Sequence, residues 1–256
     1  MTWTLFLQAG AMTFFLGVGL LRPRVPQGLF IPETGVNLLT GGTLFALRVG
    51  VVLAVSGQAL APQGLLDGAA IKAPALQFLV AFLLLDFTRY WVHRADHRIS
   101  FLWRFHRVHH SSERLNATSG LRMHAVDLLQ LTAIPIVLYW LLLDVSSFES
   151  WVIPAAMAMG IVFDSFQHAN IAMDMTKSIN KAFNMVLNNP HFHSWHHTRD
   201  GFLRDGNYGN VLVVWDRIFK SQVTQDSSPE SLGLPVDQQL EQGVFGLQLM
   251  RPQKRT

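Results

Sequence analysis

Five long apolar stretches restrict the possible folds of this chain more than any other feature of its sequence. A helix needs about 20 largely apolar residues to cross the hydrocarbon core of a bilayer. The stretches that approach this length are residues 2–20, 42–61, 75–92, 126–144 and 150–167. Charged residues make up only 14% of the chain, against roughly 25% in soluble domains. We therefore predict an all-α, integral membrane bundle that forms a single domain over residues 1–256.

The basic residues predict on which side of the membrane each loop lies. Cytosolic loops of membrane proteins carry an excess of lysine and arginine. Arg22 and Arg24 follow the first stretch, and residues 94–122 contain six arginines, whereas residues 62–74 contain one lysine and residues 144–149 contain no basic residue. This distribution predicts a multi-pass protein of the bacterial inner membrane or endoplasmic reticulum, with the arginine-rich loop in the cytosol. The formal charge of +3 is too small to indicate nucleic-acid binding.

Histidines are concentrated in one part of the sequence, and all 11 lie between His93 and His197. In the motifs HRADH, HRVHH and HSWHH they are three or four residues apart, which places the rings on one face of a helix. These motifs supply His93, His97, His106, His109, His110, His193, His196 and His197. Because one metal ion usually takes three or four protein ligands, eight imidazoles indicate two metals. We expect a cytosolic histidine-rich helical cap over residues 93–219 that holds a dinuclear site, followed by a polar tail, residues 222–256.

The type of metal is restricted by residues that are missing. The chain has no cysteine, so thiolate zinc sites and protein-bound iron–sulfur clusters are excluded. The HExxH motif of zinc proteases is absent. Glu113 and Glu149 are the only glutamates between the first and last histidine, and neither begins the Glu-x-x-His motif of soluble di-iron bundles. Imidazole ligands alone are compatible with iron, zinc, copper or nickel.

Three histidines outside the motifs need separate interpretation. His168 follows the fifth apolar stretch, one turn after Asp164, and we expect it to bind metal while Asp164 orients its ring. His124 opens the fourth stretch, and the sequence is equally compatible with a ligand or another role for it. His191 lies two residues before His193, so on a helix its ring points away from the HSWHH ligands, which favours a structural role.

Six motifs follow one another between about Asp86 and Phe219: HRADH, LWRFHRVHHS, RMH, QHANI, HSWHH and DGNYGNVLVVWDRIFKS. In this order they resemble the fatty acid hydroxylase and sterol desaturase superfamily of membrane di-iron enzymes. The resemblance implies two irons held mainly by histidine near the cytosolic membrane surface, although zinc can replace iron in purified material. It also implies an oxidoreductase that uses dioxygen, and electrons from a separate haem or iron–sulfur donor protein, to hydroxylate or desaturate a lipid.

The resemblance also assigns expected roles to individual residues. It places His168 in an additional ligand motif, where Asn170 stands in place of a second histidine, which leaves His124 and His191 as candidates to complete the set. The residues expected to support the ligands are Asp86, Asp164, Asn170, Asp205, Asn207 and Tyr208.

Two other functions are compatible with a membrane protein that has many histidines. One is a divalent-metal transporter or metal-binding protein, whose ligands are expected near the bilayer midplane. The histidines here fall at the ends of the predicted spans or beyond them. The other is a zinc-dependent lipid hydrolase, for which the sequence offers no evident serine nucleophile or glutamate base. We favour oxygen-dependent lipid hydroxylation or desaturation, with sterol, fatty acyl and related lipids as possible substrates.

Overall fold

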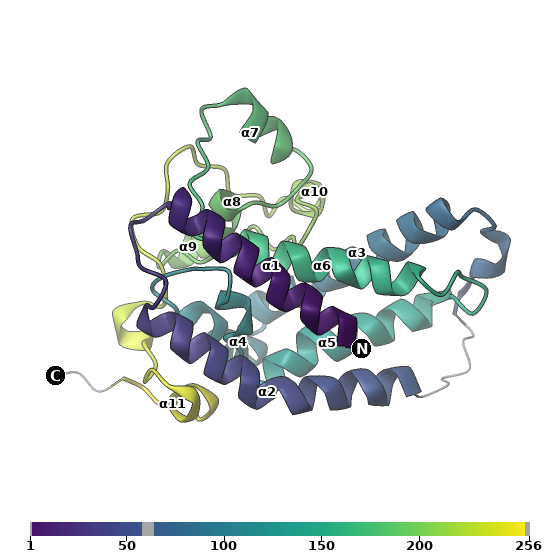
Figure 1. Cartoon of the computed structure of the whole chain (residues 1–256), viewed down its shortest axis with the longest axis horizontal. Helices are drawn as coiled ribbons and strands as arrows, with labels where there is room; N and C mark the ends of the chain where they lie inside the picture. Colours follow the sequence, from purple (N-terminus) through teal and green to yellow (C-terminus); the bar gives the residue numbers. More distant parts are fainter. Residues whose placement is uncertain (1, 58–63, 254–256) are drawn as a thin grey trace.

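The computed structural model describes residues 2–57 and 64–253 and is mostly helical (Figure 1). Long helices lie at all five predicted apolar stretches. They are α1 (Thr2–Leu21), α2 (Pro32–Gly57), α3 (Pro74–Arg98), α5 (Ala125–Leu142) and α6 (Val152–Gln167). Within the described residues the only strands are β1 (Leu66–Asp67) and β2 (Leu143–Asp144), a two-residue parallel pair. These observations confirm that the protein is mostly helical, as the sequence predicted.

Two helices of the described part, α3 and α5, are long and apolar enough to cross a membrane by length and composition. Shorter apolar stretches occupy Phe6–Leu21 in α1 and all of α6. Helix α2 begins well before the predicted stretch 42–61, and the last residues of that stretch lie outside the described residues. The arrangement of five spans therefore stays a prediction.

Helix α3 is the centre of the bundle, because it packs against both α5 and α6. Helix α1 packs on α6, and α2 packs on α5. The main core contains buried Phe82 of α3, Tyr139 of α5 and Ala156 of α6. Helix α3 begins at Pro74, whose fixed φ suits a first helical turn. It continues without a break past the apolar residues to Arg98, so one rigid helix joins the bundle to the histidines.

Short helices and turns form a cap at one end of the bundle (Figure 1). They are α4 (Ser100–His106), η2 (His109–Ser111), η3 (Ser119–Leu121), α7 (Ser178–Phe183), α8 (Pro190–His196), α9 (Gly201–Arg204), α10 (Val214–Ile218), η4 (Val236–Gln238) and α11 (Val244–Gln248). A further 3-10 turn, η1 (Gly68–Ala70), follows β1. Helix α8 has a defined start, because the Asn189 side chain accepts a hydrogen bond from the Phe192 N–H and Pro190 occupies the first turn.

The C-terminal segment packs against the cap, although its polar composition predicted a tail. Leu234, Leu240 and Leu247 are fully buried and form a core cluster with Val108. The Gln248 side chain donates to the Met123 carbonyl and accepts from the Ala125 N–H at the start of α5. This segment therefore closes the cap beside the second histidine motif.

We expect the substitution Leu247→Ala to lower the free energy of unfolding by about 2–5 kcal/mol, since it leaves a cavity at a fully buried position. Leu249→Ala is the matched control, because that side chain is 56% exposed. Thermal unfolding in detergent measures both variants. Equal losses for the two leucines would contradict the packing of this segment.

Candidate metal centre

Nine of the ten predicted ligands converge into two groups. Within each group, ligand atoms from all the residues lie within 4.8 Å of one another. The first group is His93, His97, His106, His110 and His196, and the second group is His109, His168, His193 and His197. All of these residues except His93 are buried. The groups adjoin, because the ring centroids of His110 and His197 are 4.4 Å apart.

The helical spacing of the motifs explains which rings come together. The last turns of α3 carry His93 and His97, which are four residues apart and share the first group. In HRVHH and HSWHH, the two residues four apart share a group and the third histidine belongs to the other. These two motifs therefore each contribute to both groups. His168 joins the second group from the C-terminal end of α6.

Four rings are oriented by hydrogen bonds from Nδ1 to backbone carbonyl oxygens. The pairs are His93 with Tyr208 (2.8 Å), His109 with Arg122 (3.2 Å), His168 with Asp164 (2.7 Å) and His196 with Gly206 (2.8 Å). A carbonyl can only accept, so in each pair the proton is on Nδ1. In a neutral ring, Nε2 then presents its lone pair.

These tautomers test whether the second group fits a metal ion. Nε2 of His109 and Nε2 of His168 are 3.1 Å apart, yet both carry lone pairs and no proton lies between them. Burial lowers the pKa of both rings, which disfavours an added proton. A shared cation removes this repulsion. Two nitrogens bound at right angles, each about 2.1 Å from one metal, are about 3.0 Å apart, so the spacing fits.

The other contacts of the second group have the same spacing. Nε2 of His193 is 3.0 Å from Nε2 of His168 and 3.1 Å from Nε2 of His197. In the first group, Nε2 of His106 and Nε2 of His110 are 3.2 Å apart. Both groups are therefore compatible with coordination through Nε2.

Two carboxylates support rings of the first group. Asp205, a predicted supporting residue, has Oδ1 3.3 Å from Nδ1 of His97. Asp127 was not predicted, and its Oδ1 lies 3.0 Å from Nδ1 of His106, with both side chains buried. Asp96 lies beside this pair, close enough to form a third group of potential metal ligands with it. The position of Asp127 in the first turn of α5, in the motif RMHAVD, is the one sequence feature that could have indicated it.

His124 lies outside both groups, so the structure does not bring it to the other predicted ligands. It is the N-cap of α5, where its Nδ1 accepts from the Val126 N–H at 3.0 Å. Its Nε2 is 2.9 Å from the Gln248 carbonyl oxygen. His191 also lies outside, with Nε2 2.7 Å from the Gln225 carbonyl oxygen. Neither histidine completes a ligand group here.

Asp86 holds the last of the six motifs, DGNYGNVLVVWDRIFKS, against α3. Its buried carboxylate accepts from the N–H groups of Val211 and Leu212, each at 3.1 Å, and from the Trp215 indole at 2.9 Å. These bonds fix the segment that also supplies Gly206 and Tyr208. Asp86 therefore stabilises the backbone segment whose carbonyls orient His93 and His196, and forms its own hydrogen bonds with residues 211, 212 and 215.

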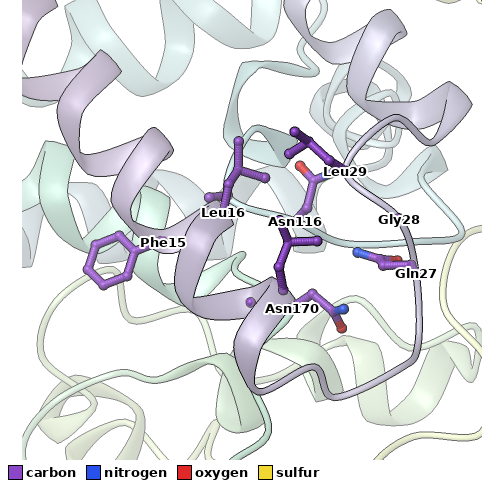
Figure 2. Close-up of a pocket in the computed structure, with 10 residues that line it drawn as sticks. Phe15, Leu16, Gln27, Gly28, Leu29, Asn116 and Asn170 are labelled. Atoms are coloured by element: carbon purple, nitrogen blue, oxygen red, sulfur yellow. The ribbon is translucent and has the colours of Figure 1, made fainter.

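Asn170 also has a structural role that differs from the expected one. Its side chain donates to the Val25 carbonyl at 2.7 Å and accepts from the Val25 N–H at 3.1 Å. Figure 2 shows Asn170 among the residues that line a small pocket, together with Leu16 of α1 and Gln27 of the connector. Asn170 thus fixes the connector after α1 and does not substitute for a histidine ligand.

The remaining expected residues lie close to the ligands. The Asp164 carboxylate is 3.9 Å from Nδ1 of His168, farther than the backbone carbonyl of the same residue. The Tyr208 ring packs against His97, with centroids 5.2 Å apart. Asn207, which has a positive φ of 58°, donates to the Phe192 carbonyl and so ties this segment to α8.

The buried histidines predict that the metal-free protein is sensitive to acid. Burial lowers the pKa of His109, His110, His193, His196 and His197 well below 6.5. Below pH 6.5 the unfolded chain binds protons that the folded chain does not. The free energy of unfolding therefore decreases as the pH is lowered. We expect a loss of about 1.4 kcal/mol per pH unit for each ring that stays neutral. An unfolding temperature that is equal or higher at about pH 5.5 than at about pH 7.5 would contradict this.

Comparisons with known proteins identify the family that has this arrangement of histidine motifs. The family model "Fatty acid hydroxylase" matches residues 78–221. Human alkylglycerol monooxygenase is 31% identical over 139 residues, covering 54% of this chain and 29% of the relative. The zebrafish (Danio rerio) alkylglycerol monooxygenase is 30% identical over 149 residues, covering 55% and 29%. The ornithine lipid hydroxylase OlsE of Rhizobium tropici is 27% identical over 181 residues, covering 71% and 51%.

This chain spans about half the length of the bacterial relative and under a third of the length of the two animal relatives. No solved structure gives a significant match. The matched family region extends over more than half of the chain and contains every histidine of both groups. The chain therefore belongs to the fatty acid hydroxylase family, within the fatty acid hydroxylase and sterol desaturase superfamily.

Proposed function

We propose that this chain is a membrane-embedded di-iron monooxygenase that hydroxylates a lipid. The observation that supports this most directly is the pair of adjoining histidine groups, in which Nε2 lone pairs face one another at metal-ligand spacing. The names of the relatives describe monooxygenation or hydroxylation of alkylglycerols and ornithine lipids. Desaturation of a similar lipid is the alternative outcome of the same chemistry.

Each histidine group would hold one iron. The first group offers five imidazoles and the second offers four, and all are nitrogen ligands that suit iron. When bound, the two irons would supply the activation of dioxygen, with electrons from a separate donor protein. The backbone carbonyls of Tyr208, Gly206, Arg122 and Asp164 hold four of the rings in the tautomer that presents Nε2.

The position of the site supports reaction with a lipid. It lies where α3 ends, where α5 begins and where α6 ends, so it occupies one end of the bundle. A lipid in the bilayer could approach between the helices, because α3 and α5 are membrane-capable. Burial of eight of the nine rings excludes bulk water from the metal ligands. The arginine distribution supports a cytosolic location for this end of the bundle.

The transporter alternative has less support. A transporter is expected to hold its ions near the middle of its spans, within broken helices. Here the ligands lie at helix ends and in the cap. A zinc hydrolase would also be compatible with the ligand groups, but the family membership favours redox chemistry.

The test is expression of the chain in an iron-replete host, followed by metal analysis and by lipid profiling under isotopically labelled dioxygen. We expect two irons per chain and a lipid that has gained one oxygen atom from dioxygen. Zinc at full occupancy together with a hydrolysed lipid would favour the hydrolase. An iron-loaded chain that leaves every lipid unchanged, with host reductases present, would contradict the monooxygenase.

A further inference from the structure

A surface around α7 takes no part in the metal centre. Its large apolar side chains are Ile179, Met185 and Val186, with exposed fractions of 73%, 58% and 54%. Figure 1 shows α7 projecting from the rest of the molecule. Isolated exposed apolar residues are ordinary, but three in one short segment indicate a surface that another phase or molecule covers.

The exposure of this segment is fixed by the fold. The Arg217 guanidinium donates to the backbone carbonyl of Met185 at 2.7 Å, which holds the turn after α7. The Phe183 ring contacts the Phe166 ring of α6, with centroids 6.1 Å apart. Since α6 is one of the apolar helices, α7 is tied to the part of the molecule that we propose enters the bilayer.

Backbone hydrogen bonds hold the C-terminal end of α1 to the segment that precedes α7. The Arg24 N–H donates to the Asn170 carbonyl at 3.1 Å, and the Ala172 N–H donates to the Arg22 carbonyl at 2.9 Å. The residues after α1 are thus bound to the segment that leads into α7. Leu21, at the end of α1, is 84% exposed. Exposed apolar side chains therefore occur at the end of α1 and in α7, and these backbone bonds hold the end of α1 to the segment that precedes α7.

Exposed basic residues occur in the same elements as these apolar side chains. Lys177 and Lys181 are exposed on and beside α7, and Arg22 is exposed after α1. Lys181 is 3.4 Å from Asp226, a pair in which both side chains are more than half exposed, so its charge stays accessible to other anions. An apolar patch bordered by cations is typical of elements that lie in the headgroup region of an anionic bilayer.

We propose that α7 and the turn after it form an interfacial anchor on the anionic phospholipid leaflet. Ile179, Met185 and Val186 lie at the boundary between headgroups and acyl chains, and Lys177 and Lys181 contact the phosphates. The anchor holds α8, which follows it in the chain, at a fixed depth relative to the lipid. This inference rests on the membrane embedding in the proposed function.

The absence of cysteine from the chain makes the test direct, because a single introduced cysteine is a unique label site. The Met185→Cys variant is labelled with an environment-sensitive fluorophore and placed in nanodiscs of phosphatidylcholine and phosphatidylglycerol. If this variant does not fold, Ile179→Cys is labelled in its place. Leu141→Cys, on an α5 side chain that is 59% exposed, reports whether the bundle is embedded. Asp237→Cys, an exposed position in the polar C-terminal segment, is the aqueous reference.

The expected result is blue-shifted emission, with quenching by nitroxide-labelled lipids, at Met185 and Leu141 but not at Asp237. Quenching at Leu141 alone would overturn the anchor and leave the embedding intact. Lack of quenching at both would overturn the embedding and the anchor with it. Adding Lys177→Gln and Lys181→Gln should reduce quenching at Met185 in anionic discs and leave it unchanged in neutral discs. Equal quenching in anionic discs with and without the lysines would contradict recognition of anionic lipid.

Discussion

His109→Ala is expected to reduce lipid oxygenation by more than about 100-fold, because loss of a residue that merely supports a ligand already costs 10–100-fold. His109 belongs to the second group, where its Nε2 lies 3.1 Å from that of His168. Its removal leaves three imidazoles in that group, whereas the first group keeps five. We therefore expect bound iron to fall from two atoms toward one per chain. Metal analysis and product formation on the same purified sample measure both effects.

The matched control for this variant is His191→Ala. His191 is also buried and lies in the same region of sequence, but it is outside both groups and its Nε2 is paired with the Gln225 carbonyl. We expect this variant to keep two irons. Equal loss of iron from the His109 and His191 variants would indicate general unfolding of the cap. Full iron content and activity in His109→Ala would contradict the assignment of the second group.

The helical part of the site could be predicted from sequence because ligand spacing and helix geometry share a period. Residues four apart lie on one face of a helix, and the structure keeps such pairs together, as in His93 with His97 and His193 with His197. The apolar stretches likewise placed five helices, since burial or membrane insertion requires continuous apolar length. These predictions depend only on neighbours along the chain.

The division of ligands between the two groups could not be predicted. His109 and His110 are adjacent in sequence but belong to different groups, because adjacent residues point to different sides of a turn. Which side faces which histidine group depends on the packing of α3, α6 and α8 around them. The carbonyls of Arg122 and Gly206 that orient two rings have no sequence signature, because every residue has a carbonyl group.

The burial of the C-terminal segment could not be predicted from sequence for a similar reason. Its buried leucines Leu234, Leu240 and Leu247 are six and seven residues apart, with both polar and apolar residues between them, so they follow no single helical or strand period. Their burial results from contact with Val108, which is distant in sequence. Composition therefore predicted a polar tail, whereas tertiary contacts make it part of the cap.

Asp127→Asn is expected to lower metal affinity or activity by about 10–100-fold, the usual effect of removing the partner of a ligating histidine. The Asp127 carboxylate lies 3.0 Å from Nδ1 of His106 inside the protein, where both side chains are fully buried. Asparagine keeps the shape and an acceptor oxygen but removes the negative charge. The His106 ring should therefore keep its position while its Nε2 becomes a weaker donor to the metal. Competition with an iron chelator measures the affinity.

Asp164→Asn makes the same change beside a different ligand and is the matched control. There the ring of His168 is held by the backbone carbonyl of residue 164 at 2.7 Å, which the substitution preserves, while the carboxylate is 3.9 Å away. We expect a smaller effect than at Asp127, since a longer and more exposed charge pair contributes less. The unfolding temperature of each metal-free variant separates a loss of fold from a loss of ligand strength. Equal weakening by the two substitutions would contradict the expected dependence on the distance between charge and ring. Iron binding that is unchanged in Asp127→Asn, at an unchanged unfolding temperature, would contradict any role of the Asp127 charge.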